Sequence, residues 1–376
     1  MKRTVCTACI LLSVLLSVVV TGGEKSEISA KSAIVAEVYT GTVLYRKDES
    51  RTRPMASTTK IMTALIAIEN ASLTDVYTVT AQAATVGGSQ LGLLEGEKIP
   101  LEDLLYMLML KSANDAAETI ANGVAGSLEK FVGLMNRKAS QLGCENTHFV
   151  NPHGMPDPDH YTTASDLATI ASEAWKNPTF RQIVGSEKHA LKGYHGLVIK
   201  NSNKLLRSYE YCVGGKTGFT KEAGRCLVCF AQKDGVTLVT VTLCDPNDWD
   251  DHARLFEECF GFVSRVKMYD TGEFGIKAPV LGSHEGQVRL INTEPIYIIL
   301  FEGIDVNYGY RIDTVPYLFA PLKAGVCVGN VTVQCNNRDV CAVPLAVSET
   351  VEEEQVQTDF FSLFLLRLKR LFSLVV

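Results

Sequence analysis

The stretch MASTTKIMTA at residues 55–64 decides the fold class of this chain. Pro54 precedes it and a mostly apolar run at residues 61–68 follows it. This pattern predicts a helix that begins near Ser57 and is buried along most of its surface. Ser57 and Lys60 are three residues apart and share one face of that helix. The serine hydroxyl and the lysine amine are therefore expected within hydrogen-bond reach.

Two further short strings follow, Ser112-Ala113-Asn114 and Lys216-Thr217-Gly218. The first comes directly after an apolar run at residues 101–110, which predicts a second helix, and the second lies in a β-rich run at residues 211–217. Each string alone occurs often by chance. In this order, however, S-x-x-K, S-x-N and K-T-G resemble the motif set of serine acyl-enzymes that bind penicillin.

The first pair suits nucleophilic catalysis. A serine hydroxyl is a poor nucleophile at neutral pH and needs a neighbouring base. Lys60 can be that base for Ser57 only if its pKa falls far below its ordinary value of ~10.4, through burial and a nearby cation. Lys216 can supply the cation if its strand packs against the helix.

The second pair is expected on the opposite wall of the site. Ser112 and Asn114 are two positions apart, so in an extended or turn segment both project toward Ser57. Ser112 can then relay a proton toward the leaving group, and Asn114 can bind a substrate amide.

The third string predicts a strand edge that lines the cleft. Gly218 leaves room for a substrate to approach the backbone. The cation of Lys216, together with the hydroxyl of Thr217, suits a carboxylate.

The chain is long enough for two or more domains, with 376 residues, of which 46% are hydrophobic and 21% charged. Residues 31–268 alternate in blocks between helical and antiparallel-type β patterns, which predicts an α+β domain with helices on a sheet. Strands are expected at 32–39, 42–45, 211–217, 224–231 and 237–243, and a third helix at 116–142.

Residues 272–348 have short β runs and few helical patterns, which predicts a small all-β domain with a turn at Asn336-Asn337. An acidic linker follows at 349–359. On a helix, the aromatic and leucine side chains of 360–376 gather mostly on one arc, opposite Arg367, Lys369 and Arg370. This predicts an amphipathic helix that lies in a membrane interface, and the alternative is a terminal helix packed on the protein itself.

The N-terminus resembles an export signal. Lys2 and Arg3 precede an apolar run at residues 5–20, and small residues follow, so a signal peptide is expected at 1–23, with an alternative cut after Ala30. A retained transmembrane anchor is the alternative, but the run is shorter than the ~20 residues that span a bilayer.

Nine cysteines follow the predicted signal peptide, an odd number that cannot all pair within the chain. Cys226 and Cys229 are three apart on a predicted strand and therefore face opposite sides of the sheet. Buried thiols that pack as small hydrophobic groups are the preferred interpretation.

Metal, cofactor and nucleic-acid functions find no support in the sequence. The chain has no H-E-x-x-H or G-x-S-x-G string, so its histidines are interpreted as loop or core residues, and no metal or cofactor is expected. The net charge of −6, without a basic stripe, disfavours nucleic-acid binding. The histidines interpreted as loop or core residues are His148, His153, His160 and His252.

Residues 30–376 resemble the low-molecular-weight penicillin-binding proteins that are D-alanyl-D-alanine carboxypeptidases. The resemblance rests on the stretch 55–64, on Asn151-Pro152-His153-Gly154 with the residues up to 164, and on the stretch KTGFT at 216–220. It implies a penicillin-binding/β-lactamase-like transpeptidase fold, followed by the small all-β domain and a C-terminal amphipathic helix.

The resemblance also implies a mechanism on peptidoglycan stem peptides. Ser57 would form an acyl-enzyme with the penultimate D-Ala, Lys60 would be the general base, and Lys216 would hold the terminal carboxylate. Ser112 and Asn114 would assist. The backbone N–H groups of Ser57 and Phe219 would form the oxyanion hole, with Thr217 and Gly218 beside them.

The family comparison has further consequences for inhibition and location. β-Lactams would be covalent inhibitors, and the protein would be exported and held on the outer face of the bacterial cytoplasmic membrane by residues 360–376. Members often have an arginine that helps to bind the carboxylate, and whether Arg254 replaces it is open.

Two alternatives remain at this stage. A class A β-lactamase uses a glutamate to activate the deacylating water, but no glutamate lies between Asn146 and Ser172. A non-catalytic penicillin-binding scaffold is disfavoured by the presence of Ser57, Lys60 and Lys216.

Overall fold

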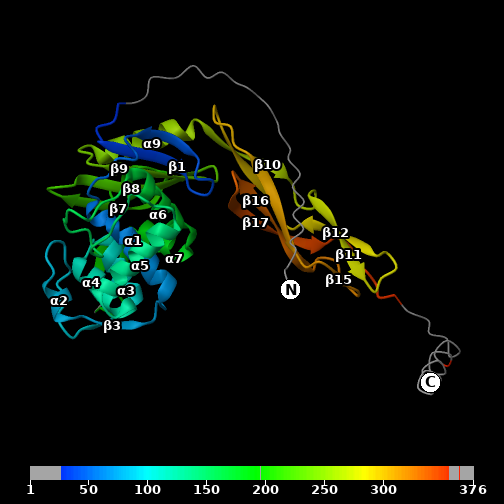
Figure 1. Ribbon diagram of the computed structural model, residues 1–376, viewed down its shortest axis with the longest axis horizontal. Coiled ribbons are helices and arrows are strands. Elements are labelled where there is room, and N and C mark those ends of the chain that lie inside the picture. The colour runs from blue at the N-terminus through cyan, green and yellow to red at the C-terminus, as the bar shows by residue number, and fades with distance from the viewer. Residues whose placement is uncertain (1–26, 195, 355–363, 365–376) are drawn as a thin grey trace, which may run out of the picture. The chain divides into compact units, whose positions relative to one another are not determined.

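The computed structural model describes residues 27–194, 196–354 and 364. The described chain divides into two compact units, one formed by residues 27–265 and 299–306 and the other by residues 266–298 and 307–354 (Figure 1). The predicted signal peptide at 1–23 and, except for Phe364, the predicted amphipathic segment at 360–376 lie outside the described residues. Among the residues that are described, no helix is long and apolar enough to cross a membrane.

The larger unit is built on a five-stranded antiparallel sheet with the strand order β2-β1-β9-β8-β7. The two central strands β8 and β9 are nearly continuous runs of buried residues, as expected for strands that are covered on both faces. The strands are β1 (Ser32–Glu37), β2 (Val43–Lys47), β7 (Cys212–Thr220), β8 (Gly224–Lys233) and β9 (Val236–Leu243).

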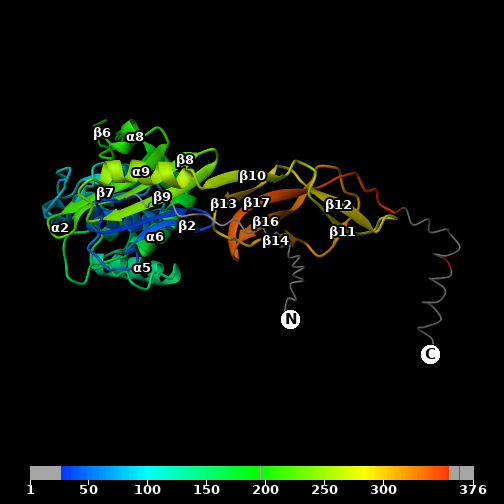
Figure 2. The ribbon, with the colours of Figure 1, turned by 90° about the horizontal axis from the view of Figure 1, so that it is seen from above.

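Helices cover both faces of this sheet, so the prediction of an α+β fold with helices on an antiparallel sheet is confirmed. One face packs against the larger helical group, and the other against α8 (Leu205–Ser208) and α9 (Asp248–Phe260). Figure 1 shows α9 on the side of the sheet away from α1 and α6, and Figure 2 gives the view from above. The larger group comprises α1 (Lys60–Asn70), α3 (Leu101–Leu110), α4 (Asn114–Ala125), α5 (Leu128–Gln141), α6 (Ala164–Lys176) and α7 (Pro178–Gly185).

Smaller elements complete this unit. A 3₁₀ turn, η1 (Ala56–Thr59), leads directly into α1, and α2 (Ala81–Thr85) lies before the second motif. Two short hairpins pair β3 (Val76–Thr78) with β4 (Lys98–Pro100) and β5 (Lys188–Ala190) with β6 (Val198–Lys200).

The predicted helix at 116–142 is wrong as a single element, because two helices replace it. α4 ends at Gly126, which adopts the left-handed conformation with φ of 78°, and Ser127 then caps α5 by accepting a hydrogen bond from the Lys130 N–H at 3.2 Å. A glycine C-cap followed by a serine N-cap is the ordinary signal for such a break.

The cysteines of β8 follow the predicted alternation. Cys226 packs in the core on the α1 side of the sheet and Cys229 in the core on the α9 side, and neither forms a disulfide. Burial as a small hydrophobic group also holds for Cys144, Cys212, Cys259 and Cys335. It does not hold for Cys327 and Cys341, which are exposed.

The smaller unit is all β in its described part. A six-stranded sheet has the order β14-β16-β17-β12-β11-β15, and β10 (Val263–Tyr269) pairs with β13 (Ile296–Phe301). The predicted turn joins β16 to β17, and both asparagines, Asn336 and Asn337, have positive φ as a two-residue hairpin turn requires. The sheet comprises β11 (Gly275–Leu281), β12 (Gln287–Asn292), β14 (Tyr308–Thr314), β15 (Leu318–Phe319), β16 (Cys327–Cys335) and β17 (Arg338–Val347).

A pair of buried carboxyl groups fastens the beginning of the described chain to α9. Ser29 Oγ lies 2.6 Å from Asp245 Oδ1 and 2.8 Å from Asp251 Oδ2, and the Ser29 N–H donates to Asp251 Oδ2 at 2.6 Å. Burial raises the pKa of Asp245 to about 6. Burial also acts to raise the pKa of Asp251, but the hydrogen bonds from Ser29 hold it below its ordinary value. Near pH 5, Asp245 is therefore protonated beside a charged Asp251.

Asp245 predicts a contribution to stability that decreases as pH rises. The folded protein keeps a proton on Asp245 that the unfolded chain loses near pH 4, so this contribution is present below pH 4 and lost as pH passes about 6. The variant Asp245→Asn is neutral at every pH and avoids the loss. In thermal unfolding between pH 4.5 and 8, the melting temperature of Asp245→Asn minus that of the wild type should increase as pH rises.

The exposed Asp250 lies nearby on α9, and Asp250→Asn is the matched control, with no such trend expected. A constant difference between Asp245→Asn and the wild type across this range would contradict the prediction.

Candidate active site

The first motif lies at the junction of η1 and α1. α1 begins at Lys60, so Ser57 occupies the 3₁₀ turn just before the helix, and not the helix itself. The predicted contact is present, because Lys60 Nζ lies 2.9 Å from Ser57 Oγ. The turn is tightly wound, with Ala56 in the left-handed region at φ of 48°. Non-glycine residues held in this region are frequent at functional sites.

Lys60 is fully buried, and its amine has three oxygen neighbours. Besides Ser57, Nζ donates to Asn114 Oδ1 and to the backbone carbonyl of His153, each at 2.7 Å. Burial, with a further contribution from the positive charge of Lys216, holds the pKa of Lys60 well below its ordinary value, and the charge of Asp115 opposes them. The low pKa expected from the sequence is therefore found, with the expected causes.

The second motif is placed differently from the prediction. Asn114 begins α4, and both ends of its amide are already bound, since Oδ1 accepts from Lys60 and Nδ2 donates to the Gly87 carbonyl at 2.7 Å. Ser112 has φ of 61°, and its buried Oγ has no hydrogen-bond partner among the described residues. Of these two side chains, only Asn114 forms a hydrogen bond with the lysine amine.

Asp115 is a site residue that the sequence analysis missed. Its fully buried carboxylate accepts hydrogen bonds from three successive backbone N–H groups, at 2.9 to 3.1 Å. These donors belong to Leu91, Gly92 and Leu93. The neighbouring Ser89 carbonyl accepts from the Asn114 N–H at 2.7 Å, so Asp115 fixes the loop that meets the second motif. Its position directly after Asn114 was the available signal.

The third motif lies on β7, which packs against η1. Lys216 is buried, its Nζ donates to the Thr217 carbonyl at 2.7 Å, and burial lowers its pKa to about 7. A Cβ added to Gly218 would lie 3.1 Å from the backbone nitrogens of Ser57 and Thr58. Gly218 therefore lets the strand approach the serine turn. Phe219 follows with 67% of its surface exposed.

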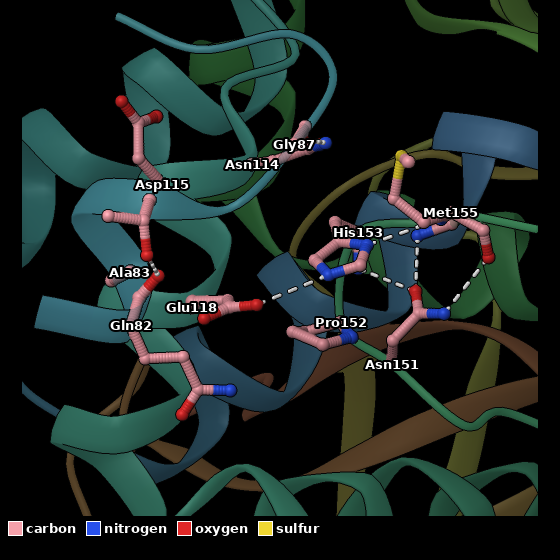
Figure 3. A network of polar contacts seen from close by, with 12 residues as sticks. Gln82, Ala83, Gly87, Asn114, Asp115, Glu118, Asn151, Pro152, His153 and Met155 are labelled. Carbon is pink, nitrogen blue, oxygen red and sulfur yellow. Dashed lines mark hydrogen bonds and ion pairs between the residues drawn. The ribbon is translucent and has the colours of Figure 1, made fainter. Parts of the chain in front are cut away.

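A loop from the region after α5 completes the surroundings of the lysine. Figure 3 shows Asn151, His153 and Met155 of this loop. Asn151 organises it, since Oδ1 accepts from the His153 and Gly154 N–H groups at 3.3 and 2.7 Å and Nδ2 donates to the Met155 carbonyl at 3.0 Å. Gly154 has φ of 89°, and a Cβ there would lie 1.9 Å from the Ala56 carbonyl oxygen. The loop is thus pressed against the serine turn and presents the His153 carbonyl to the amine.

The other histidines act within the core or at the surface. Val150 N–H donates to His160 Nδ1 at 3.1 Å, so His160 Nε2 carries the proton and donates to Thr59 Oγ1 at 2.8 Å. Burial lowers the pKa of His160 to about 4 and that of His252 to about 3, and His148 is exposed. Among the described residues, no group of three or more His, Cys, Asp or Glu side chains could hold a metal ion.

Arg254 does not join the site. It lies on α9, on the opposite face of the sheet, where Nη2 pairs with Asp251 Oδ1 at 2.7 Å. Arg254 therefore does not replace the arginine that helps family members to bind the carboxylate. Lys216 is the cation that the structure places next to the serine and lysine pair.

A serine hydroxyl in contact with a buried amine of low pKa defines a serine acyl-transfer site. Comparison with known proteins agrees. The family profile described as D-alanyl-D-alanine carboxypeptidase matches residues 19–247, and the profile described as penicillin-binding protein 5, C-terminal domain, matches residues 264–353.

Individual relatives extend over both units. D-alanyl-D-alanine carboxypeptidase DacF of Bacillus subtilis is 30% identical over 345 residues, covering 88% of this chain and 89% of that protein. DacC of Escherichia coli is 30% identical over 347 residues, covering 88% and 86%. The crystal structure of penicillin-binding protein 5 from Haemophilus influenzae superposes with a TM-score of 0.64 at 25% identity, covering 88% of this chain and 100% of that one. The chain belongs to the D-alanyl-D-alanine carboxypeptidase family and is a serine-type D-Ala-D-Ala carboxypeptidase.

The close approach of Gly154 to the serine turn generates a prediction. In Gly154→Ala the new methyl group collides with the Ala56 carbonyl, so the loop must shift away from Lys60. We expect a large fall in melting temperature and at least a tenfold slower reaction with penicillin, since a displacement of ~1 Å in a site can cost about 100-fold in rate. Both are measured on the purified full chain.

Gly143→Ala is the matched control, because Gly143 also has positive φ, at 75°, but a Cβ there meets nothing within 4 Å. It should lose only the ~1–2 kcal/mol of a left-handed alanine and keep the penicillin reaction. If Gly154→Ala behaves like Gly143→Ala, the packing argument is wrong.

Proposed function

We propose that Ser57 is the nucleophile of this carboxypeptidase and that Lys60, in its neutral form, is the general base. The observation that supports this best is the 2.9 Å contact between Ser57 Oγ and a buried amine of lowered pKa. A neutral amine has two N–H groups and one lone pair. Asn114 and the His153 carbonyl accept the two N–H groups, which leaves the lone pair for the Ser57 proton.

The proposed acylation removes the terminal D-alanine of a peptidoglycan stem peptide. Ser57 Oγ attacks the carbonyl carbon of the penultimate D-Ala while its proton passes to Lys60 Nζ. The backbone N–H groups of Ser57 and Phe219 receive the developing oxyanion. The peptide bond then breaks, and the proton reaches the departing D-Ala amine by way of Ser112, whose buried hydroxyl has no competing partner among the described residues.

Deacylation reverses the same chemistry with water. Lys60, neutral again, takes a proton from a water molecule that attacks the ester carbon. The ester bond breaks, Ser57 Oγ regains a proton, and the shortened stem peptide leaves. No cofactor is needed, because each step is a proton transfer coupled to attack on an acyl carbon.

Substrate orientation is assigned to the third motif. Lys216 and the hydroxyl of Thr217 would bind the terminal carboxylate, which replaces the backbone contact that Lys216 makes here. The negative charge would favour the protonated form of Lys216, and this cation would in turn keep Lys60 neutral. Gly218 and the exposed Phe219 would border the bound peptide. The main role of Asn114 would be to orient Lys60, and it would also bind the substrate amide.

The same reaction path predicts covalent inhibition by β-lactams. The opened ring would remain esterified to Ser57, because residues 146–172 contain no glutamate to activate a deacylating water in the way of class A β-lactamases. A long-lived adduct therefore distinguishes the carboxypeptidase from a penicillin-destroying enzyme.

The function is tested with diacetyl-Lys-D-Ala-D-Ala and with penicillin. The wild type should release D-Ala and form the long-lived adduct, and Ser57→Ala should lose both activities by at least about 1,000-fold, as loss of a nucleophile does. Ser127→Ala removes a serine that only caps α5 and should retain them. Rapid penicillin turnover, or D-Ala release by Ser57→Ala, would overturn the assignment.

We further propose the domain organisation and location that the sequence suggests. Residues 1–23 would be a signal peptide, 31–268 the catalytic domain, 272–348 the β domain and 349–359 a linker. Residues 360–376 would lie in the membrane interface on the outer face of the cytoplasmic membrane, where stem peptides are found. The first family profile ends at residue 247 and the second begins at residue 264, which supports the two-domain part of this proposal.

Membrane attachment has its own prediction. Replacing Arg367, Lys369 and Arg370 by glutamine should weaken binding of the mature chain to vesicles rich in anionic lipid by about 100-fold, since each such charge contributes ~1 kcal/mol. Sedimentation with vesicles measures this. The control replaces three exposed lysines of the larger unit, Lys188, Lys192 and Lys200, and should change little. Equal losses in both variants would contradict a specific role for the C-terminal segment.

A further inference from the structure

The side chain of His153 has a partner that the catalytic scheme does not use. Its carbonyl accepts from Lys60 Nζ at 2.7 Å, while its imidazole turns away and meets Glu118, with 3.4 Å between Nε2 and Oε1 (Figure 3). Both side chains are buried, with exposed fractions of 8% and 6%. A buried carboxylate and imidazole next to the proposed base require an explanation.

The hydrogen bonds fix the tautomer of this imidazole. The Met155 N–H donates to His153 Nδ1 at 3.2 Å, so the ring proton is on Nε2, the nitrogen that lies next to Glu118. Burial, with the nearby charge of Lys60, lowers the pKa of His153, while Glu118 opposes this. The neutral ring is thus held between a backbone donor on one side and a carboxylate acceptor on the other.

Helix α4 carries both Asn114, which contacts the Lys60 amine, and Glu118, which contacts His153. Asn114 and Glu118 are four residues apart, and therefore lie on one face of the helix. Asn114 touches Lys60 directly, and Glu118 reaches it only through His153. The charges that act on the pKa of Lys60 are those of Lys216 and Asp115. Glu118 is thus connected to the base through the loop that carries His153.

We propose that Glu118 is a positioning residue for the acylation step. By holding the His153 imidazole, it fixes the His153 carbonyl, which takes one N–H of Lys60 and so directs the lone pair at Ser57. This inference rests on the proposed role of Lys60 as base. Without Glu118 the imidazole has no acceptor for its Nε2 proton, and the carbonyl can turn with the ring.

Four single variants of the full chain separate position from charge: Glu118→Gln, Glu118→Asp, Glu118→Leu and His153→Leu. Glu118→Gln keeps an oxygen acceptor at the same distance and should acylate within about threefold of the wild type. Glu118→Asp keeps the charge but withdraws it by one methylene, and Glu118→Leu removes the acceptor. Both should slow penicillin acylation by about 10- to 100-fold, as small misplacements do.

The kinetic pattern distinguishes positioning from a general structural defect. Since the substrate contacts are untouched, kcat for the tripeptide should fall with the acylation rate while KM stays within about twofold. His153→Leu, which retains the carbonyl, should match Glu118→Leu. The double variant that combines Glu118→Leu with His153→Leu should be no slower than either single variant, because the two substitutions remove the same contact. Melting temperatures identify any variant that fails to fold, and the comparison of Glu118→Asp with Glu118→Gln then decides.

The proposal is overturned by wild-type acylation rates in Glu118→Asp and Glu118→Leu, by a Glu118→Gln enzyme as slow as Glu118→Asp, or by additive losses in the double variant. Failure of the proposed function looks different. In that case the wild-type chain itself forms no penicillin adduct on Ser57, whereas an unaffected Glu118→Leu enzyme removes only the positioning role.

Discussion

A lysine amine buried away from water is the constraint on which this active site depends. A buried ammonium without partners is strongly disfavoured, so the amine must either be neutral or be surrounded by acceptors. Both conditions apply to Lys60. Asn114 and the His153 carbonyl accept hydrogen bonds from its amine, and burial together with the charge of Lys216 disfavours the protonated form. The serine turn, helix α4 and the loop that carries His153 must therefore meet at a single nitrogen atom, and β7 packs against the serine turn.

The close meeting requires backbone that can approach backbone. Gly218 on β7 and Gly154 in the loop both lie against the serine turn. A Cβ at Gly154 would collide with the Ala56 carbonyl, and a Cβ at Gly218 would make tight contacts with main-chain atoms of the turn. Ala56 and Ser112, next to the proposed reacting groups, adopt positive φ although they are not glycines. Such conformations are unfavourable and persist only where surrounding contacts hold them. The rigid five-stranded sheet and its buried helices provide those contacts.

Local patterns predicted much of this architecture. An apolar run predicted the helix at 101–110, strand alternation placed Cys226 and Cys229 on opposite faces of the sheet, and short β runs predicted the β domain at 272–348. A short stretch of sequence contains each of these patterns in full. The single helix expected at 116–142 was wrong because the Gly126-Ser127 break was overlooked. Arg254, an open candidate from its position in the chain, lies on the far face of the sheet.

The sequence by itself determined which two residues meet, since a spacing of three brings Ser57 and Lys60 within reach of each other across one turn. Tertiary structure alone decided what surrounds that pair. The His153 carbonyl is a backbone oxygen that every residue possesses, so no side-chain pattern marks it as a ligand of Lys60. The same holds for Asp115 and Glu118, whose partners are far away in sequence or are backbone groups. Contacts of this kind exist only after helices, strand and loop have packed, because packing brings together atoms that the sequence keeps apart.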